Sequence, residues 1–101
     1  MANVQDDFEL TLSTAAGNDP ALIAELRDCF AQSLAIHLDL LNRARCDGNW
    51  QMAAQRLRGL GASFHTGELV TLADEALEGA PGDPAILRKL TGFAGRFSAT
   101  A

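Results

Sequence analysis

The stretch A-A-Q-R-L-R-G-L-G-A-S-F-H-T-G, residues 53–67, has the apolar spacing of one face of a helix. Its larger apolar side chains recur at intervals of four, three and four residues, at Ala53, Leu57, Leu60 and Phe64. A helix with this period turns a second set of residues to the opposite side, namely Gln55, Arg58, Gly59 and Ala62. The pattern predicts that the first set is buried and the second exposed.

The predicted exposed side is unusual because it lacks the long polar residues that favour a helix. Gly59 in mid-helix costs about 1 kcal/mol relative to alanine, and Ala62 beside it is also small. Gly61 lies between the two faces. Small residues at such a place suit the close approach of another protein, and they equally suit packing against a neighbouring helix of the same fold. The sequence leaves both explanations open.

Helix starts and breaks divide the rest of the chain. Asp19-Pro20 and Asp83-Pro84 each place Asp at an N-cap and Pro at the first helical position. Asp47-Gly48-Asn49 is typical of a turn, and Thr66 offers an N-cap to a further helix. The helices expected from these signals cover residues 7–16, 20–46, 49–65, 67–78 and 84–97.

The sequence predicts an all-α protein because strand-like alternation is absent from it. Short connections between the long helices make neighbours antiparallel. We therefore expect one domain, residues 1–101, built as an antiparallel four-helix bundle with a short additional N-terminal helix. Hydrophobic residues make up 48% of the chain, which is enough for a small core.

Charge and composition exclude several classes of protein. The net charge of −5 and the pI near 4.7 argue against nucleic acid as the main partner. A membrane span needs about 18 apolar residues in a row, and the sequence has no such run and no signal-peptide pattern. We therefore expect a cytoplasmic protein that does not enter a membrane.

Residues 54–64 resemble the signature helix of histidine-containing phosphotransfer (HPt) domains, the relay modules of multistep two-component signalling. That signature is roughly A-H-x-L-K-G, followed by small residues and then an apolar one. The matching residues are Ala54, Leu57, Arg58, Gly59, Gly61, Ala62 and Phe64. The resemblance extends over about residues 19–97 and implies the same bundle fold. Where the family carries its phosphorylated histidine, this chain has Gln55.

The resemblance implies a relay module without its acceptor, because a glutamine amide has no lone pair that takes a phosphoryl group as an imidazole nitrogen does. It also implies a partner, which is a response-regulator receiver domain or a sensor histidine kinase. Arg58 stands where the family has a lysine, and Gly59 leaves room beside position 55. The predicted partner-binding surface consists of Met52, Gln55, Arg56, Arg58, Gly59 and Ala62. No intrinsic catalysis is expected.

Two alternatives to an acceptor-less docking protein remain open. The chain could be a genuine phosphotransfer module with a His-to-Gln replacement, or a helical structural or oligomerisation domain that packs on itself through the small residues. We expect a monomer. Basic residues also gather near the signature, at Arg43, Arg45, Arg56 and Arg58. This patch would suit an acidic receiver site, although it could equally be a solvated hairpin tip with no partner.

The remaining reactive side chains give weak signals. His37 lies in the apolar stripe of its helix, opposite residues 58–60, and His65 lies near the end of the signature helix; neither is expected to replace the acceptor. Cys29 and Cys46 are expected to be free thiols of a reducing compartment. Neither cysteine has metal-site spacing, and no cofactor motif occurs, so we expect no metal and no cofactor.

Overall fold

The computed structural model describes residues 4–97, and all of the regular structure in that range is helical. This confirms the all-α prediction. The five helices are α1 Val4–Ala16, α2 Pro20–Arg43, α3 Asp47–Ser63, α4 Gly67–Glu78 and α5 Pro84–Gly95.

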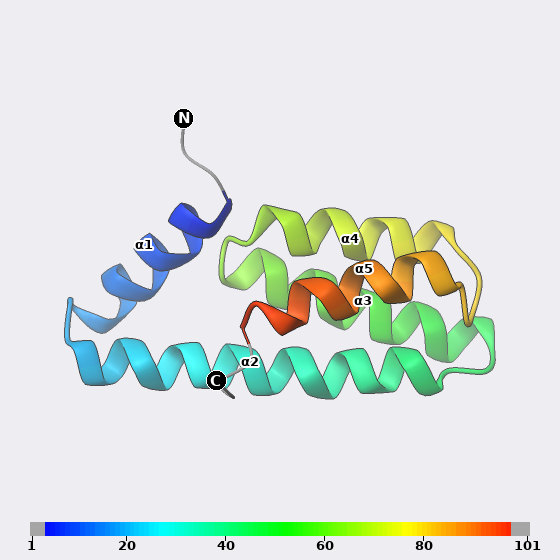
Figure 1. The fold of residues 1–101 in the computed structure, drawn as a ribbon, viewed down its shortest axis with the longest axis horizontal. Coiled ribbons are helices and arrows are strands. Elements are labelled where there is room, and N and C mark those ends of the chain that lie inside the picture. Colours follow the sequence, from blue (N-terminus) through cyan, green and yellow to red (C-terminus); the bar gives the residue numbers. More distant parts are fainter. Residues whose placement is uncertain (1–3, 98–101) are drawn as a thin grey trace.

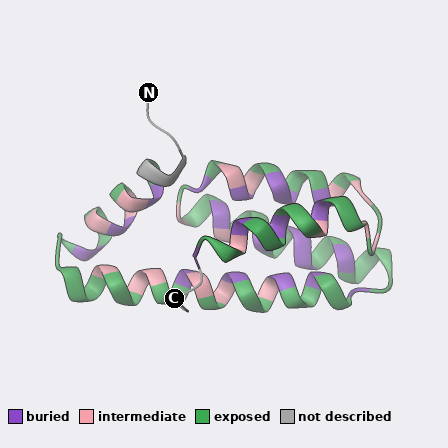
Figure 2. Ribbon diagram, viewed as in Figure 1, coloured by how far each residue is buried: buried purple, intermediate pink, exposed green. Residues whose placement is uncertain are grey.

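Helices α2 to α5 pack in a ring, in which α2 contacts α3, α3 contacts α4, α4 contacts α5, and α5 contacts α2. Figure 1 shows that successive helices of the ring run in opposite directions. Helix α1 stands at an angle to the others and packs on the first half of α2 (Figure 1). The buried residues of the ring face inward, and its outer surface is mostly exposed (Figure 2).

Both Asp-Pro helix starts are confirmed. The Oδ1 atom of Asp19 accepts a hydrogen bond from the backbone N–H of Ala21, and Asp83 does the same with Ala85, each at 3.0 Å. Each bond satisfies one of the N–H groups that the first turn of a helix leaves free. Thr66 also occupies an N-cap position, but its hydroxyl donates to the carbonyl of Gly61 instead of capping α4.

The predicted turn at Asp47-Gly48-Asn49 is wrong. Helix α2 ends at Arg43 instead of Cys46, and α3 already begins at Asp47. The chain reverses through residues 44–46, where Ala44 and Cys46 are both extended. The early start of α3 brings Trp50 into the core, where its indole N–H donates to the carbonyl of Ala76 at 2.7 Å. Tertiary packing therefore outweighs the turn preference of the local sequence.

All five phenylalanines meet at one end of the molecule. Phe8 of α1 lies 4.7 Å from Phe30 and 5.1 Å from Phe97, measured between ring centroids, and Phe64 lies 5.0 Å from Phe30. Phe93 completes the cluster, 4.9 Å from Phe97. Offset or tilted aromatic pairs at these distances are favourable beyond the area they bury. Helix α1 thus closes one end of the helical ring with an aromatic side chain.

Polar contacts also hold α1 in place. Arg27 of α2 donates two hydrogen bonds to Glu9, at 2.6 and 2.7 Å, and this pairing lowers the pKa of Glu9 below its usual value. The hydroxyl of Thr11 donates to the carbonyl of Asp7, so it must accept its second hydrogen bond from Nδ1–H of His65, at 3.0 Å. Helix α1 is therefore tied both to α2 and to the turn between α3 and α4.

Several details of the predicted apolar stripes need correction. Leu57 is fully buried as predicted, whereas Leu60 and Phe64 are half-buried at the edge of the core. Helix α1 begins at Val4, ahead of the predicted Asp7, and it buries Ala16, whereas Ala15 is exposed. On α2 the buried residues are Phe30, Leu34, Leu38 and Leu41. The apolar residues Leu22 and Leu40 of the same helix are exposed.

Candidate partner-binding face of α3

The outward face of α3 carries all six residues that the sequence assigns to partner binding. Gln55, Arg58, Gly59 and Ala62 are exposed, and so are Met52 and Arg56. The opposite face of α3 is buried through Trp50, Ala53, Ala54, Leu57 and Gly61. Position 55 thus lies near the middle of a helix that the core holds firmly from behind. Gln55 itself has no side-chain hydrogen bond to the described part of the chain.

The two glycines of this helix have different surroundings. A Cβ atom built on Gly61 would lie 3.1 Å from Cβ of Leu69 and 3.1 Å from both Cγ2 and the backbone N of Val70. Gly61 is therefore the residue that lets α4 approach α3. A Cβ atom on Gly59 would meet nothing within 4 Å. Packing between helices of this chain thus accounts for Gly61 and leaves Gly59 without an intramolecular reason.

Arg58 is already occupied by a neighbour. Its Nε donates to Oδ1 of Asp74 on α4 at 2.8 Å, and about half of each side chain remains exposed. Exposed ion pairs of this kind contribute roughly 0–1 kcal/mol, so another anion can displace Asp74. The sequence did not indicate this pair, because the two residues are sixteen positions apart on different helices.

The predicted basic patch is only partly free. Arg43 pairs with Asp39 at 3.1 Å, and Arg45 donates to the carbonyls of Asn42 and Ala44. Arg56, by contrast, has no carboxylate partner among residues 7–97. A carboxylate of a partner can therefore pair with Arg56 without displacing a carboxylate of this chain.

His37 of α2 lies close to α3. The sequence places it opposite residues 58–60, but the cation that affects it is Arg56. Burial, and then the charge of Arg56, lower the pKa of His37 below 6.5, which favours the neutral imidazole. Its Nδ1 atom is buried and has no hydrogen-bond partner within the described chain. His37 thus lies on the side of α2 that faces α3, and the two helices pack against each other.

Large apolar side chains lie exposed on α2 and α3. Ile36 is 60% exposed, Leu40 is 37% exposed and Met52 is 45% exposed. Met52 was predicted from the sequence to be part of the partner-binding surface, and the other two residues were not. Ile36 lies off the apolar stripe of its helix, which was a signal for an outward-facing apolar residue. Large apolar residues exposed on a surface are candidates for contact with a partner.

The other candidates of the sequence do not reach this face. His65 lies in the turn after α3 with a backbone φ of 56°, and its ring is engaged by Thr11. Cys29 and Cys46 are free, as predicted, and both are exposed. The described residues contain no group of His, Cys, Asp or Glu arranged to hold a metal ion. Within residues 4–97, none of the helices has the length and apolar character that crossing a membrane requires.

Comparison with known proteins gives no match to this chain among protein-family models, curated proteins or solved structures. The resemblance to HPt domains thus depends on the residues of α3 and their order along the chain.

Proposed function

We propose that this chain is an HPt-like docking protein that binds response-regulator receiver domains, or a sensor histidine kinase, in the cytoplasm without accepting a phosphoryl group itself. In this proposal the ring of α2 to α5 corresponds to the antiparallel four-helix bundle of the HPt family, and the protein acts as a monomer. It would compete with active relay proteins for a receiver or hold a receiver out of the pathway.

One observation carries the proposal. Gln55 and Gly59 lie one turn apart on the exposed face of α3, and the space beside Gly59 is open. An exposed mid-helix glycine costs about 1 kcal/mol relative to alanine, and no other helix of residues 4–97 uses the space. Close approach of a partner at position 55 gives that glycine a role.

The chemistry around Gln55 suits the acidic site that the HPt resemblance implies for a receiver. Arg56 offers a charge without a competing carboxylate, and Arg58 can exchange Asp74 for a carboxylate of the partner. Met52 on α3 and the exposed residues Ile36 and Leu40 on α2 supply apolar surface. A mostly apolar centre with charged groups at its rim is the usual anatomy of a specific interface.

A binding titration tests the proposal. Purified, unphosphorylated receiver domains are titrated into the chain by calorimetry, with Gly59→Leu as the test variant. The matched control is Gly92→Leu on α5, because Gly92 is also helical and exposed and has nothing within 4 Å of a built Cβ. We expect Gly59→Leu to weaken binding at least about tenfold and Gly92→Leu to leave it unchanged. Equal effects of the two variants, or no binding by any receiver, would refute the docking role.

A second function is favoured by the exposed apolar residues Ile36, Leu40 and Met52. The chain could pair with another copy of itself through the same face. Sedimentation of the wild-type chain separates the two functions. A stable dimer that Gly59→Leu dissociates supports the structural or oligomerisation role, whereas a monomer over the same concentration range supports receiver docking.

A further inference from the structure

An apolar groove lies away from the α3 face, where the end of α1 meets the first half of α2. It has a volume of about 480 Å³. Its floor is apolar and includes Ala16, Leu22, Leu26 and Cys29, and its rim carries Glu25 and Asp28. We call it the α1–α2 groove. Leu22 is 44% exposed, so it does not belong to the core that stabilises the fold.

The net negative charge of the chain lies in the segment that carries this groove. Residues 1–36 contain six acids and one base, whereas residues 37–101 contain seven of each. The whole formal net charge of −5 thus belongs to the part of the chain that forms α1 and the first half of α2. The single base, Arg27, is held by two hydrogen bonds to Glu9. Neither Glu25 nor Asp28 forms an ion pair within residues 7–97, although the charge of Asp28 also acts on Arg27.

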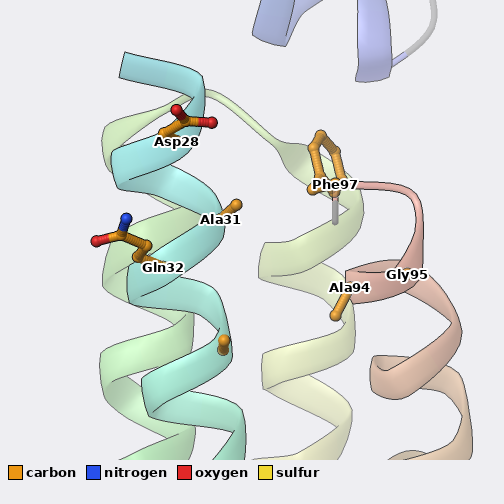
Figure 3. A pocket seen from close by; sticks show the side chains of 7 residues that line it. Asp28, Ala31, Gln32, Ala94, Gly95 and Phe97 are labelled. Atoms are coloured by element: carbon orange, nitrogen blue, oxygen red, sulfur yellow. The ribbon is translucent and has the colours of Figure 1, made fainter. Parts of the chain in front are cut away.

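A neighbouring groove, between α2 and α5, shares Asp28 and Gln32 with the α1–α2 groove. Figure 3 shows this neighbouring groove, with Ala31 on α2 and Ala94 on α5. Asp28 is exposed and lines both grooves, so its carboxylate can pair with a partner bound in the α1–α2 groove.

We propose that the α1–α2 groove is a docking site for a basic amphipathic helix of a partner protein. A groove between two helices suits a third helix, whose apolar residues at intervals of three and four would cover Leu22, Leu26 and Cys29. The Lys or Arg residues of that helix would lie beside Glu25 and Asp28. Anionic lipids and nucleic acid are repelled by the same charge. This site is separate from the α3 face and does not depend on the function proposed for that face.

The test uses a synthetic peptide of leucine and lysine with helical amphipathic spacing, titrated into the isotope-labelled full chain and followed by NMR. The comparison peptide has glutamate in place of lysine. We expect the lysine peptide to bind saturably, with the largest shifts in residues 22–32, and the glutamate peptide to bind at least about tenfold more weakly. No saturable binding, or shifts centred elsewhere, would overturn the proposal.

Two double variants distinguish binding in the groove from attraction by the net charge of the chain. Glu25→Lys with Asp28→Lys reverses the rim, whereas Asp47→Lys with Glu78→Lys reverses two exposed acids outside it; both change the net charge from −5 to −1. We expect the first to weaken binding at least about tenfold and the second less than about threefold. Equal weakening would show that the peptide follows net charge only, and the proposal would fail. Circular dichroism confirms that both variants keep their helices.

The Leu22→Glu variant tests whether the apolar floor contributes to binding. The added negative charge should strengthen binding of the lysine peptide, whereas the loss of apolar surface should weaken it. The substitution adds a negative charge to the groove, and it places glutamate in the first turn of α2, where the helix dipole favours it. If the peptide uses the apolar floor, we expect weaker binding despite the added charge. Tighter binding would contradict the proposal. Self-association of the wild-type chain that Leu22→Glu abolishes would assign the groove to a second copy and would also contradict it.

Discussion

Alanine substitutions at two neighbouring glycines of α3 should have different effects on stability. Gly59→Ala adds a methyl group to open space, so the gain in helix propensity should stabilise the fold by about 0.5–1 kcal/mol. Gly61→Ala has the same propensity gain, but its Cβ would lie 3.1 Å from Leu69 and from the side chain and backbone of Val70. Overpacking of this kind costs roughly 1–3 kcal/mol. The net effect at Gly61 is therefore between about zero and 2.5 kcal/mol of destabilisation.

Urea denaturation at neutral pH measures both effects, with a thermal scan as a second reading. A difference of about 1–3 kcal/mol between the variants corresponds to roughly 4–20 °C in Tm for a domain of this size. Gly92→Ala is the matched control and should behave like Gly59→Ala, because it is also an exposed helical glycine. If Gly61→Ala stabilised the protein as much as Gly59→Ala, the close contact between α3 and α4 would be wrong. The assignment of Gly59 to the outer face would then lose its basis.

Two further predictions concern the core and the pH dependence of stability. Trp50→Phe removes the indole hydrogen bond to the carbonyl of Ala76 and leaves space in the core, and we expect a loss of roughly 1–3 kcal/mol by urea denaturation; an unchanged midpoint would contradict the burial of Trp50 and its hydrogen bond to Ala76. His37 has a pKa lowered by burial and by the charge of Arg56, so the unfolded chain takes up a proton there more readily than the folded chain. Its contribution to stability is complete above about pH 6.5 and is lost as the pH falls from about 6.5 through the lower folded pKa. His37→Gln should therefore flatten this part of a plot of unfolding free energy against pH, and an unchanged slope would count against the buried position of the ring.

Local signals in the sequence predicted most of the helices. The two Asp-Pro starts cap helices through atoms only two residues away, and the capping bonds form as expected. The turn between α2 and α3 was misplaced because Asp47-Gly48-Asn49 has the local chemistry of a turn. Burial of Trp50 against α4, a contact between distant parts of the chain, extends α3 backward through that segment.

The sequence predicted which residues of α3 face outward, but not which residues of other helices contact them. The 3.6-residue period alone places Gln55, Gly59 and Ala62 outward, and their exposure follows from it. The pairing of Arg58 with Asp74 depends on how α3 packs on α4, which no local pattern contains. The docking of α1 through Phe8 is likewise a tertiary feature, since it joins residues from four separate segments.

Phosphoryl transfer to position 55 tests whether α3 has the acceptor face of an HPt domain. A phosphorylated receiver that binds the wild-type chain is mixed with the wild type and with Gln55→His, and the product is tested for a label that is stable in base and labile in acid. A histidine on this exposed face should titrate near its usual pKa of about 6.5, so much of it is neutral and nucleophilic at pH 7. We predict no label on the wild type and partial labelling of the variant, because Asp74 competes for Arg58. Label on the wild-type chain would contradict the account, as would a variant that binds the receiver with wild-type affinity yet accepts no phosphoryl group over hours.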